Sequence, residues 1–200
     1  MSVMKKEQIH AMTEGAVMVA VATVLSLIRF IKFPFGGSVT LLSMFPIILY
    51  SIRRGVKKGL FASFVYAVLQ LLLEIGEIMT WGLTPGVLVA CFLLDYLIPF
   101  TLIGLGGLFR KSGYAGWLGG TAFVIVLRFA SHYISGVYLW QSVGEILGHN
   151  FASPYLYSLV YNGAYMGVEL IITMIAAAVF FAIPQTKKVL LQMGLTEKLI

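Results

Sequence analysis

The chain has 200 residues, of which 60% are hydrophobic and only 11% are charged. A soluble domain usually carries about 25% charged residues, so the composition excludes an ordinary soluble protein and predicts a chain immersed in lipid. The net charge of +6 would suit nucleic acid, but the placement of the charges along the chain argues against that partner. The single cysteine, Cys91, excludes an internal disulfide and a cysteine-based zinc site.

Six apolar stretches are candidates for membrane-spanning helices, because a span needs about 20 mostly apolar residues. We predict one membrane domain over residues 1–200, an all-α bundle of six transmembrane helices. Pro46 interrupts the second stretch and favours a kink or a re-entrant start there. The predicted helices cover residues 13–30, 39–52, 59–73, 85–109, 117–139 and 154–183.

The basic residues support this count, since six spans place both termini and the second and fourth loops on one side. The positive-inside rule assigns the side richer in Lys and Arg to the cytoplasm. We therefore predict a multi-pass protein of the bacterial cell membrane with both termini cytoplasmic. The segment RRGVKK is also suited to anionic lipid or a cytoplasmic partner. The cytoplasmic side would hold eleven of the fourteen basic residues: Lys5, Lys6, Arg53, Arg54, Lys57, Lys58, Arg110, Lys111, Lys187, Lys188 and Lys198.

The first predicted helix carries a pair of small residues, Ala16 and Ala20, within EGAVMVAVATVLS. Small residues four apart let two helices approach closely in lipid. The pair predicts either a docking surface for a partner or packing within the protein itself. Before the second helix, the glycines of FPFGGSV at 33–39 predict a mobile loop.

Asp95 and Tyr96 lie in LLDYL of the fourth predicted helix. At 1.5 Å per residue, Asp95 would lie roughly 15 Å below the outer end of that helix. A carboxylate at that depth needs a partner or a ligand. Arg128 is one candidate partner. Glu169 of the sixth helix is an alternative partner for Arg128, which would leave Asp95 free.

The fifth helix places Arg128, His132, Gly136 and Trp140 four residues apart, so they share one stripe of a helix. That stripe is either a packing seam or the wall of a ligand pocket. The sixth helix begins YSLVYNGAYMGVEL, and the third helix contributes one further aromatic residue. A pocket with carboxylates, a histidine, an amide and aromatic rings suits a flat organic cation. The residues added here are Tyr157, Asn162 and Tyr66.

Several catalytic motifs are absent from the sequence. It contains no G-x-x-x-x-G-K-[ST], no H-E-x-x-H and no G-x-S-x-G. These absences disfavour ATP binding through a P-loop, metalloprotease activity and serine hydrolysis. We expect no enzymatic activity, no cofactor and no metal, and an energy supply for uptake that comes from a partner.

With these motifs in place, the chain resembles the thiamin-specific substrate-binding subunit (S component) of bacterial energy-coupling factor transporters. The resemblance rests on RRGVKKGL, LLDYL, LRFASHYISGVYLW and YSLVYNGAYM, in this order. It implies a six-helix membrane bundle that binds the vitamin near its outer face. It also implies partners, namely a transmembrane coupling subunit and two ATPase subunits. Ala16 and Ala20 would present the A-x-x-x-A surface to the coupling subunit.

The resemblance also implies roles for the pocket residues. Asp95 would face the cationic thiazolium ring, and Asn162 would address the aminopyrimidine. Arg128 would reach the polar end of the substrate. The remaining pocket residues would be Tyr96, His132, Gly136, Trp140, Tyr157 and Tyr66.

Three functional hypotheses follow. The first is a high-affinity thiamin-binding subunit that works only with its coupling module. The second is an ion-coupled secondary carrier for an organic cation, with Asp95 or Glu169 as the proton site. The third, a membrane enzyme with Asp95 and His132 as an acid–base pair, has no nucleophile motif to support it.

Overall fold

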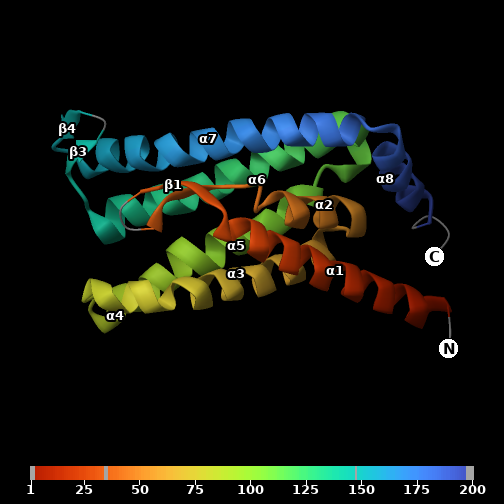
Figure 1. Ribbon diagram of the computed structural model, residues 1–200, viewed down its shortest axis with the longest axis horizontal. Coiled ribbons are helices and arrows are strands. Elements are labelled where there is room, and N and C mark those ends of the chain that lie inside the picture. The colour runs from red at the N-terminus through yellow and green to blue at the C-terminus, as the bar shows by residue number, and fades with distance from the viewer. Residues whose placement is uncertain (1–2, 34–35, 147, 197–200) are drawn as a thin grey trace.

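The computed structural model describes residues 3–33, 36–146 and 148–196, which form a bundle of long helices with two short hairpins (Figure 1). The α-helices are α1 (Val3–Leu27), α2 (Phe45–Arg54), α3 (Val56–Ile78), α4 (Pro85–Cys91), α5 (Ile98–Leu102), α6 (Gly113–Ser135), α7 (Pro154–Ala182) and α8 (Pro184–Thr196). Two segments are π-helical, η3 (Phe92–Leu97) and η6 (Gly136–Trp140). Three are 3₁₀-helical, η2 (Met79–Trp81), η4 (Ile103–Gly107) and η5 (Arg110–Ser112).

Within the described residues, four helical stretches are long and apolar enough to cross a membrane: Lys6–Leu27, Val56–Trp81, Pro85–Trp140 and Pro154–Ala182. The third has 56 residues and contains both the fourth and the fifth predicted spans. The second predicted span is represented by α2, which has only 10 residues. The protein is thus mostly helical with several membrane-capable helices, while the count of six spans stays a prediction.

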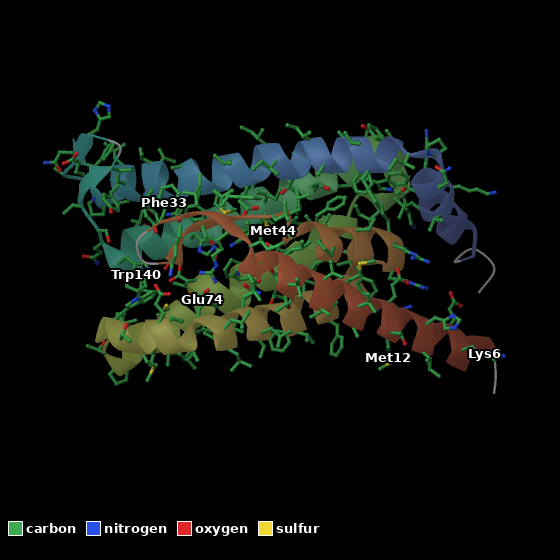
Figure 2. The ribbon with its side chains drawn as sticks, viewed as in Figure 1. Lys6, Met12, Phe33, Met44, Glu74 and Trp140 are labelled. Atoms are coloured by element: carbon green, nitrogen blue, oxygen red, sulfur yellow. The ribbon has the colours of Figure 1, made fainter. Side chains whose placement is uncertain are left out.

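Large apolar side chains point outward along the bundle, as Met12 does on α1 (Figure 2). So many large exposed apolar side chains are unusual for a soluble protein and match a lipid environment. The start of α1 and the whole of α8 lie at the same end of the bundle (Figure 1). Lys198, one of the basic residues used to predict a cytoplasmic C-terminus, lies outside the described residues. The exposed apolar residues include Val17, Val24, Phe61, Phe64, Val126, Ile171 and Ile175.

Two hairpins depart from the predicted all-α fold. Strands β1 (Arg29–Lys32) and β2 (Ser38–Thr40) pair antiparallel, as do β3 (Gly144–Ile146) and β4 (His149–Phe151). The loop expected at 33–39 is therefore partly strand, and its residues 34 and 35 lie outside the described residues. Gly36 turns with φ 97°, a value that favours glycine.

The hairpin also corrects the start of the second helix, which we predicted at Val39. That residue lies in β2, and α2 begins at Phe45. Pro46 occupies the first turn of α2, where its missing N–H breaks no helical hydrogen bond. The proline therefore begins this helix and does not kink it.

Polar contacts fasten α1 to α2 at the end of the bundle where α1 starts. Glu14 forms ion pairs with Arg53 and Arg54, with N–O distances of 2.7 and 2.5 Å. The Tyr50 hydroxyl donates a hydrogen bond to the Ala11 carbonyl at 2.8 Å. Two of the basic residues near this end therefore share one carboxylate as their ion-pair partner.

Ala16 and Ala20 lie on the exposed side of α1. The buried small residues of this helix are others, Ala11, Gly15 and Ala22. Packing within the protein, one of the two alternatives for the alanine pair, is therefore wrong.

Candidate ligand-binding pocket

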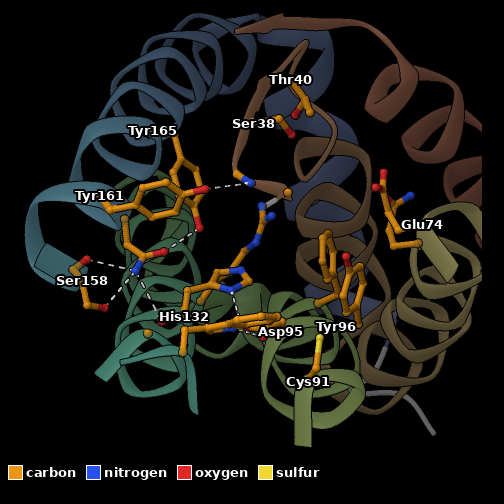
Figure 3. A pocket seen from close by; sticks show the side chains of 18 of the residues that line it. Ser38, Thr40, Glu74, Cys91, Asp95, Tyr96, His132, Ser158, Tyr161 and Tyr165 are labelled. Atoms are coloured by element: carbon orange, nitrogen blue, oxygen red, sulfur yellow. Dashed lines mark hydrogen bonds and ion pairs between the residues drawn. The ribbon is translucent and has the colours of Figure 1, made fainter. Parts of the chain in front are cut away.

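A pocket lies between α3, the two π-helical segments, α6, α7 and hairpin β1–β2. Figure 3 shows tyrosines of α7 facing Glu74 and Tyr96 across it, with Ser38 and Thr40 of the hairpin nearby. The structure places all nine predicted ligand-binding residues in its wall, and their roles in binding stay predictions. They are Tyr66, Asp95, Tyr96, Arg128, His132, Gly136, Trp140, Tyr157 and Asn162.

The two π-helical segments supply the carboxylate and one of its hydrogen-bond donors. Segment η3 carries Asp95, and η6 carries Trp140. The regular stripe predicted for the fifth helix holds only as far as Gly136, because the wider π-helical turns begin there. Such turns are rare and occur often at functional sites. The carbonyl of Leu94 in η3 accepts a hydrogen bond from the Ser131 hydroxyl at 2.8 Å, which joins η3 to α6.

Asp95 is held by side chains of α6 and η6. Its Oδ2 accepts hydrogen bonds from the Ser135 hydroxyl at 2.8 Å and from Trp140 Nε1 at 2.9 Å. Its Oδ1 lies 3.4 Å from His132 Nδ1. The carboxylate is therefore fixed in the pocket wall by neutral donors and the histidine, and 17% of its side chain remains exposed.

Arg128 does not have the carboxylate partner that we predicted. Across the described ranges it forms no ion pair, so the proposed pairs with Asp95 and Glu169 are both wrong. Its Nη1 instead donates to Met44 Sδ at 3.2 Å, and its Cζ lies 4.3 Å from the centre of the Phe100 ring. Its Nε makes no hydrogen bond to any described residue. Arg128 is 9% exposed, and its guanidinium thus keeps donor capacity inside the pocket.

Helix α7 contributes an aromatic wall and an amide. The rings of Tyr157 and Tyr161 stack with centroids 6.1 Å apart. Asn162 is oriented by its neighbours: its Nδ2 donates to the Ser158 carbonyl at 2.9 Å, and its Oδ1 accepts from the Tyr165 hydroxyl at 2.8 Å. Adjacent flat rings and a fixed amide can hold an aromatic ligand in one orientation.

Helix α7 lies close to Gly136 and takes up the space beside its backbone. In the structure, Ser158 of α7 fills that space, so an added Cβ would collide with the Ser158 hydroxyl and lie 3.4 Å from Asn162 Nδ2. The glycine permits α6 and α7 to approach closely beside the pocket.

Two ion pairs at the hairpin were not foreseen. Arg29 pairs with Glu74, and Lys32 Nζ lies 2.9 Å from Glu77 Oε2. Both pairs join hairpin β1–β2 to α3, and Arg29 and Glu74 also line the pocket. The two residues of each pair are 45 positions apart in the sequence. The only sequence signal was the opposite charge of these residues near the ends of predicted spans.

Within residues 3–33, 36–146 and 148–196, no group of three His, Cys, Asp or Glu side chains could hold a metal ion. The charged groups of the pocket wall include two carboxylates, Asp95 and Glu74, and two guanidiniums, Arg29 and Arg128, beside aromatic rings.

Comparison with known proteins assigns the family. Residues 12–190 match the family model described as thiamine transporter protein. The chain is 32% identical over 191 residues to the thiamine transporter ThiT of Bacillus subtilis, which covers 88% of this chain and 93% of the relative. It is 30% identical over 158 residues to ThiT of Lacticaseibacillus paracasei, covering 70% and 71% of the two chains.

The chain belongs to the thiamine transporter protein family. The resemblance identified from the sequence motifs is thereby confirmed. The structure of ThiT from Listeria monocytogenes shares the fold, with a TM-score of 0.69 and 24% identity over 90% of this chain and 98% of that one. The bacterial relatives and the apolar helices make this family member a multi-pass bacterial membrane protein.

Proposed function

We propose that this protein binds thiamin with high affinity in the pocket and delivers it as the substrate-binding subunit of an energy-coupling factor importer. The observation that carries the proposal is the Asp95 carboxylate, fixed by Ser135 and Trp140 beside aromatic rings. A fixed carboxylate attracts an organic cation without having to reorganise. The named relatives are thiamine transporters, which supports thiamin as that cation.

Each chemical part of thiamin has a counterpart in the wall. Asp95 faces the thiazolium cation, and Trp140 and Tyr96 offer ring faces near it. Asn162 and Tyr157 take the aminopyrimidine, which is flat and carries hydrogen-bonding nitrogens. Arg128 donates to the hydroxyl oxygen at the polar end, which would satisfy its unpaired guanidinium.

The proposed topology has six spans with both termini in the cytoplasm. Lys57 and Lys58, at the start of α3, would then lie at the cytoplasmic end of that helix. Glu74 and Glu77 would lie at its outer end. Hairpin β1–β2 is joined to these glutamates and lies at the pocket, so the pocket opens to the outside.

Uptake through such a subunit requires a source of energy outside the chain. We propose that α1 docks through Ala16 and Ala20 to a transmembrane coupling subunit, and that two ATPase subunits complete the complex. Both alanines are exposed. Assignment to a transporter family implies a non-enzyme role, and we propose that the protein has no catalytic activity and needs no cofactor.

A thiamin titration of the purified protein in detergent tests the proposal directly. Trp140 and Trp81 both line the pocket, with ring centroids 5.5 Å apart. Because thiamin would bind beside these rings, it should quench the tryptophan fluorescence saturably. Riboflavin and biotin serve as controls and should leave the fluorescence unchanged. No quenching by thiamin, together with no ligand retained through purification, would contradict the proposed ligand.

A further inference from the structure

Glu169 is a buried carboxyl group that the proposed binding mode does not use. It lies on α7, is 1% exposed and is absent from the pocket wall. It also forms no ion pair within the part of the chain that the structure describes. A carboxyl group inside a membrane bundle is costly to bury and is expected to have a function.

The contacts of Glu169 lead to the hairpin. Its Oε1 accepts a hydrogen bond from the backbone N–H of Thr40 at 2.6 Å and another from the Thr40 hydroxyl at 2.7 Å. The Thr40 hydroxyl also lies 2.7 Å from that of Ser43. Thr40 is the last residue of β2, and both Thr40 and Ser43 line the pocket. The carboxyl group therefore reaches the pocket wall through Thr40.

The segment held in this way supports other parts of the pocket. Met44 follows directly after Ser43, and its sulfur accepts the hydrogen bond from Arg128. On the other side, the Gly37 N–H donates to the Tyr161 hydroxyl at 3.3 Å. Hydrogen bonds to a carboxylate are stronger than those between neutral groups, and in a buried site their loss leaves a polar group unsatisfied.

We infer that Glu169 is a positioning residue: by accepting two hydrogen bonds from Thr40, it holds the junction between hairpin β1–β2 and α2 in the arrangement that the ligand requires. Glu169 itself does not touch the ligand. The inference rests on the proposed function for the identity of that ligand. The order of the hairpin is a structural property that can be measured without any ligand.

The first test compares thiamin affinity in three variants by isothermal titration calorimetry. Glu169→Leu removes the acceptor and should weaken binding at least about tenfold, while Glu169→Gln keeps a carbonyl acceptor and should stay closer to the wild type. Thr173→Val is the matched control, because Thr173 lies one turn further along α7, is fully buried and has a hydroxyl without a hydrogen-bond partner among the described residues. It should bind thiamin as the wild type does.

The second test measures the order of the hairpin without ligand. A nitroxide on Ile31→Cys, an exposed position of β1, reports hairpin motion, while Cys91 is fully buried and should stay unlabelled. Glu169→Leu and Thr40→Val should raise the nitroxide mobility. Thr40→Ser and Thr173→Val should leave it unchanged. If the Leu variant does not fold, the two Thr40 variants still decide the question.

The outcomes separate the inference from the proposed function. A wild type that does not bind thiamin contradicts the proposed function, and the nitroxide spectra then decide the inference alone. Unchanged mobility in the Thr40→Val variant overturns the inference. If the wild type binds thiamin, two further results overturn the inference. One is an affinity that Glu169→Leu leaves unchanged, and the other is an affinity that Glu169→Leu and Thr173→Val lower equally.

Discussion

At the scale of single residues, the pocket combines one charge that is fixed by neighbours with one that is not. Among the described residues, Asp95 has three partners, whereas the Arg128 guanidinium has only a sulfur and an aromatic ring. The sequence identified both residues, but it offered Asp95 or Glu169 as the partner of Arg128, and neither pairs with it. Because each side chain has several reachable partners in a bundle, helical spacing alone does not decide between them.

Asp95→Ala should weaken thiamin binding about 10- to 100-fold, because it removes a charge-assisted contact with the cation. Asp95→Asn keeps the shape and the acceptor and should fall between the wild type and the Ala variant. Calorimetry is the appropriate measurement, since Trp140 touches Asp95 and its fluorescence would change in the variant itself. Glu145→Gln, on β3 and outside the pocket wall, is the control. Equal affinity of Asp95→Ala and wild type would remove Asp95 from the binding site.

Gly136→Ala should lower the free energy of unfolding by about 1–3 kcal/mol, because the new methyl group overlaps the Ser158 hydroxyl and separates α6 from α7. Thermal unfolding of the ligand-free protein measures this. Gly163→Ala and Gly167→Ala are matched controls on α7, where an added Cβ meets nothing within 4 Å. A Gly136→Ala protein as stable as these controls would show that the two helices can move apart at no cost.

At the scale of elements, α1 has one face in the bundle and one free face. Tyr50 packs on Gly15, and Glu14 pairs with two arginines, so this face is held by α2. Ala16 and Ala20 lie on the free face. Small residues on an outward face are suited to the close approach of a second protein's helix.

Ala16→Leu with Ala20→Leu should therefore leave thiamin binding unchanged and abolish uptake by the assembled transporter. Calorimetry on the purified subunit and thiamin uptake by cells expressing the coupling module measure the two effects. Val17→Leu, also exposed on α1, is the control for added bulk. Full uptake by the double variant would place the docking surface elsewhere.

At the scale of the whole molecule, the six-span topology makes a prediction about sidedness. Lys187→Cys, in α8, should react with a membrane-impermeant maleimide only after the membrane is opened. Thr84→Cys, before α4, should react in intact cells. Both positions are exposed, so access to reagent depends on the side of the membrane. Labelling of both in intact cells would contradict an even number of spans.

The whole molecule also distinguishes a coupled subunit from a secondary carrier. Reconstituted alone in liposomes, the protein should not accumulate thiamin under a pH gradient. Accumulation should begin when the coupling subunit and two ATPase subunits are added with ATP on their side. Uptake by the protein alone, driven by the pH gradient, would favour the carrier hypothesis.

The sequence alone determined the lipid environment and the order of the apolar stretches, because composition and charge placement are properties of the chain itself. The nine predicted pocket residues came from helical spacing together with the family resemblance, and all nine lie in one pocket wall. The tertiary structure alone decided which side chains contact one another. Arg29 meets Glu74 across 45 residues and Thr40 meets Glu169 across 129, and no local pattern encodes such distances. It also decided the π-helical turns that bring Trp140 onto Asp95, since their wider geometry depends on packing between helices and leaves no mark in apolar periodicity.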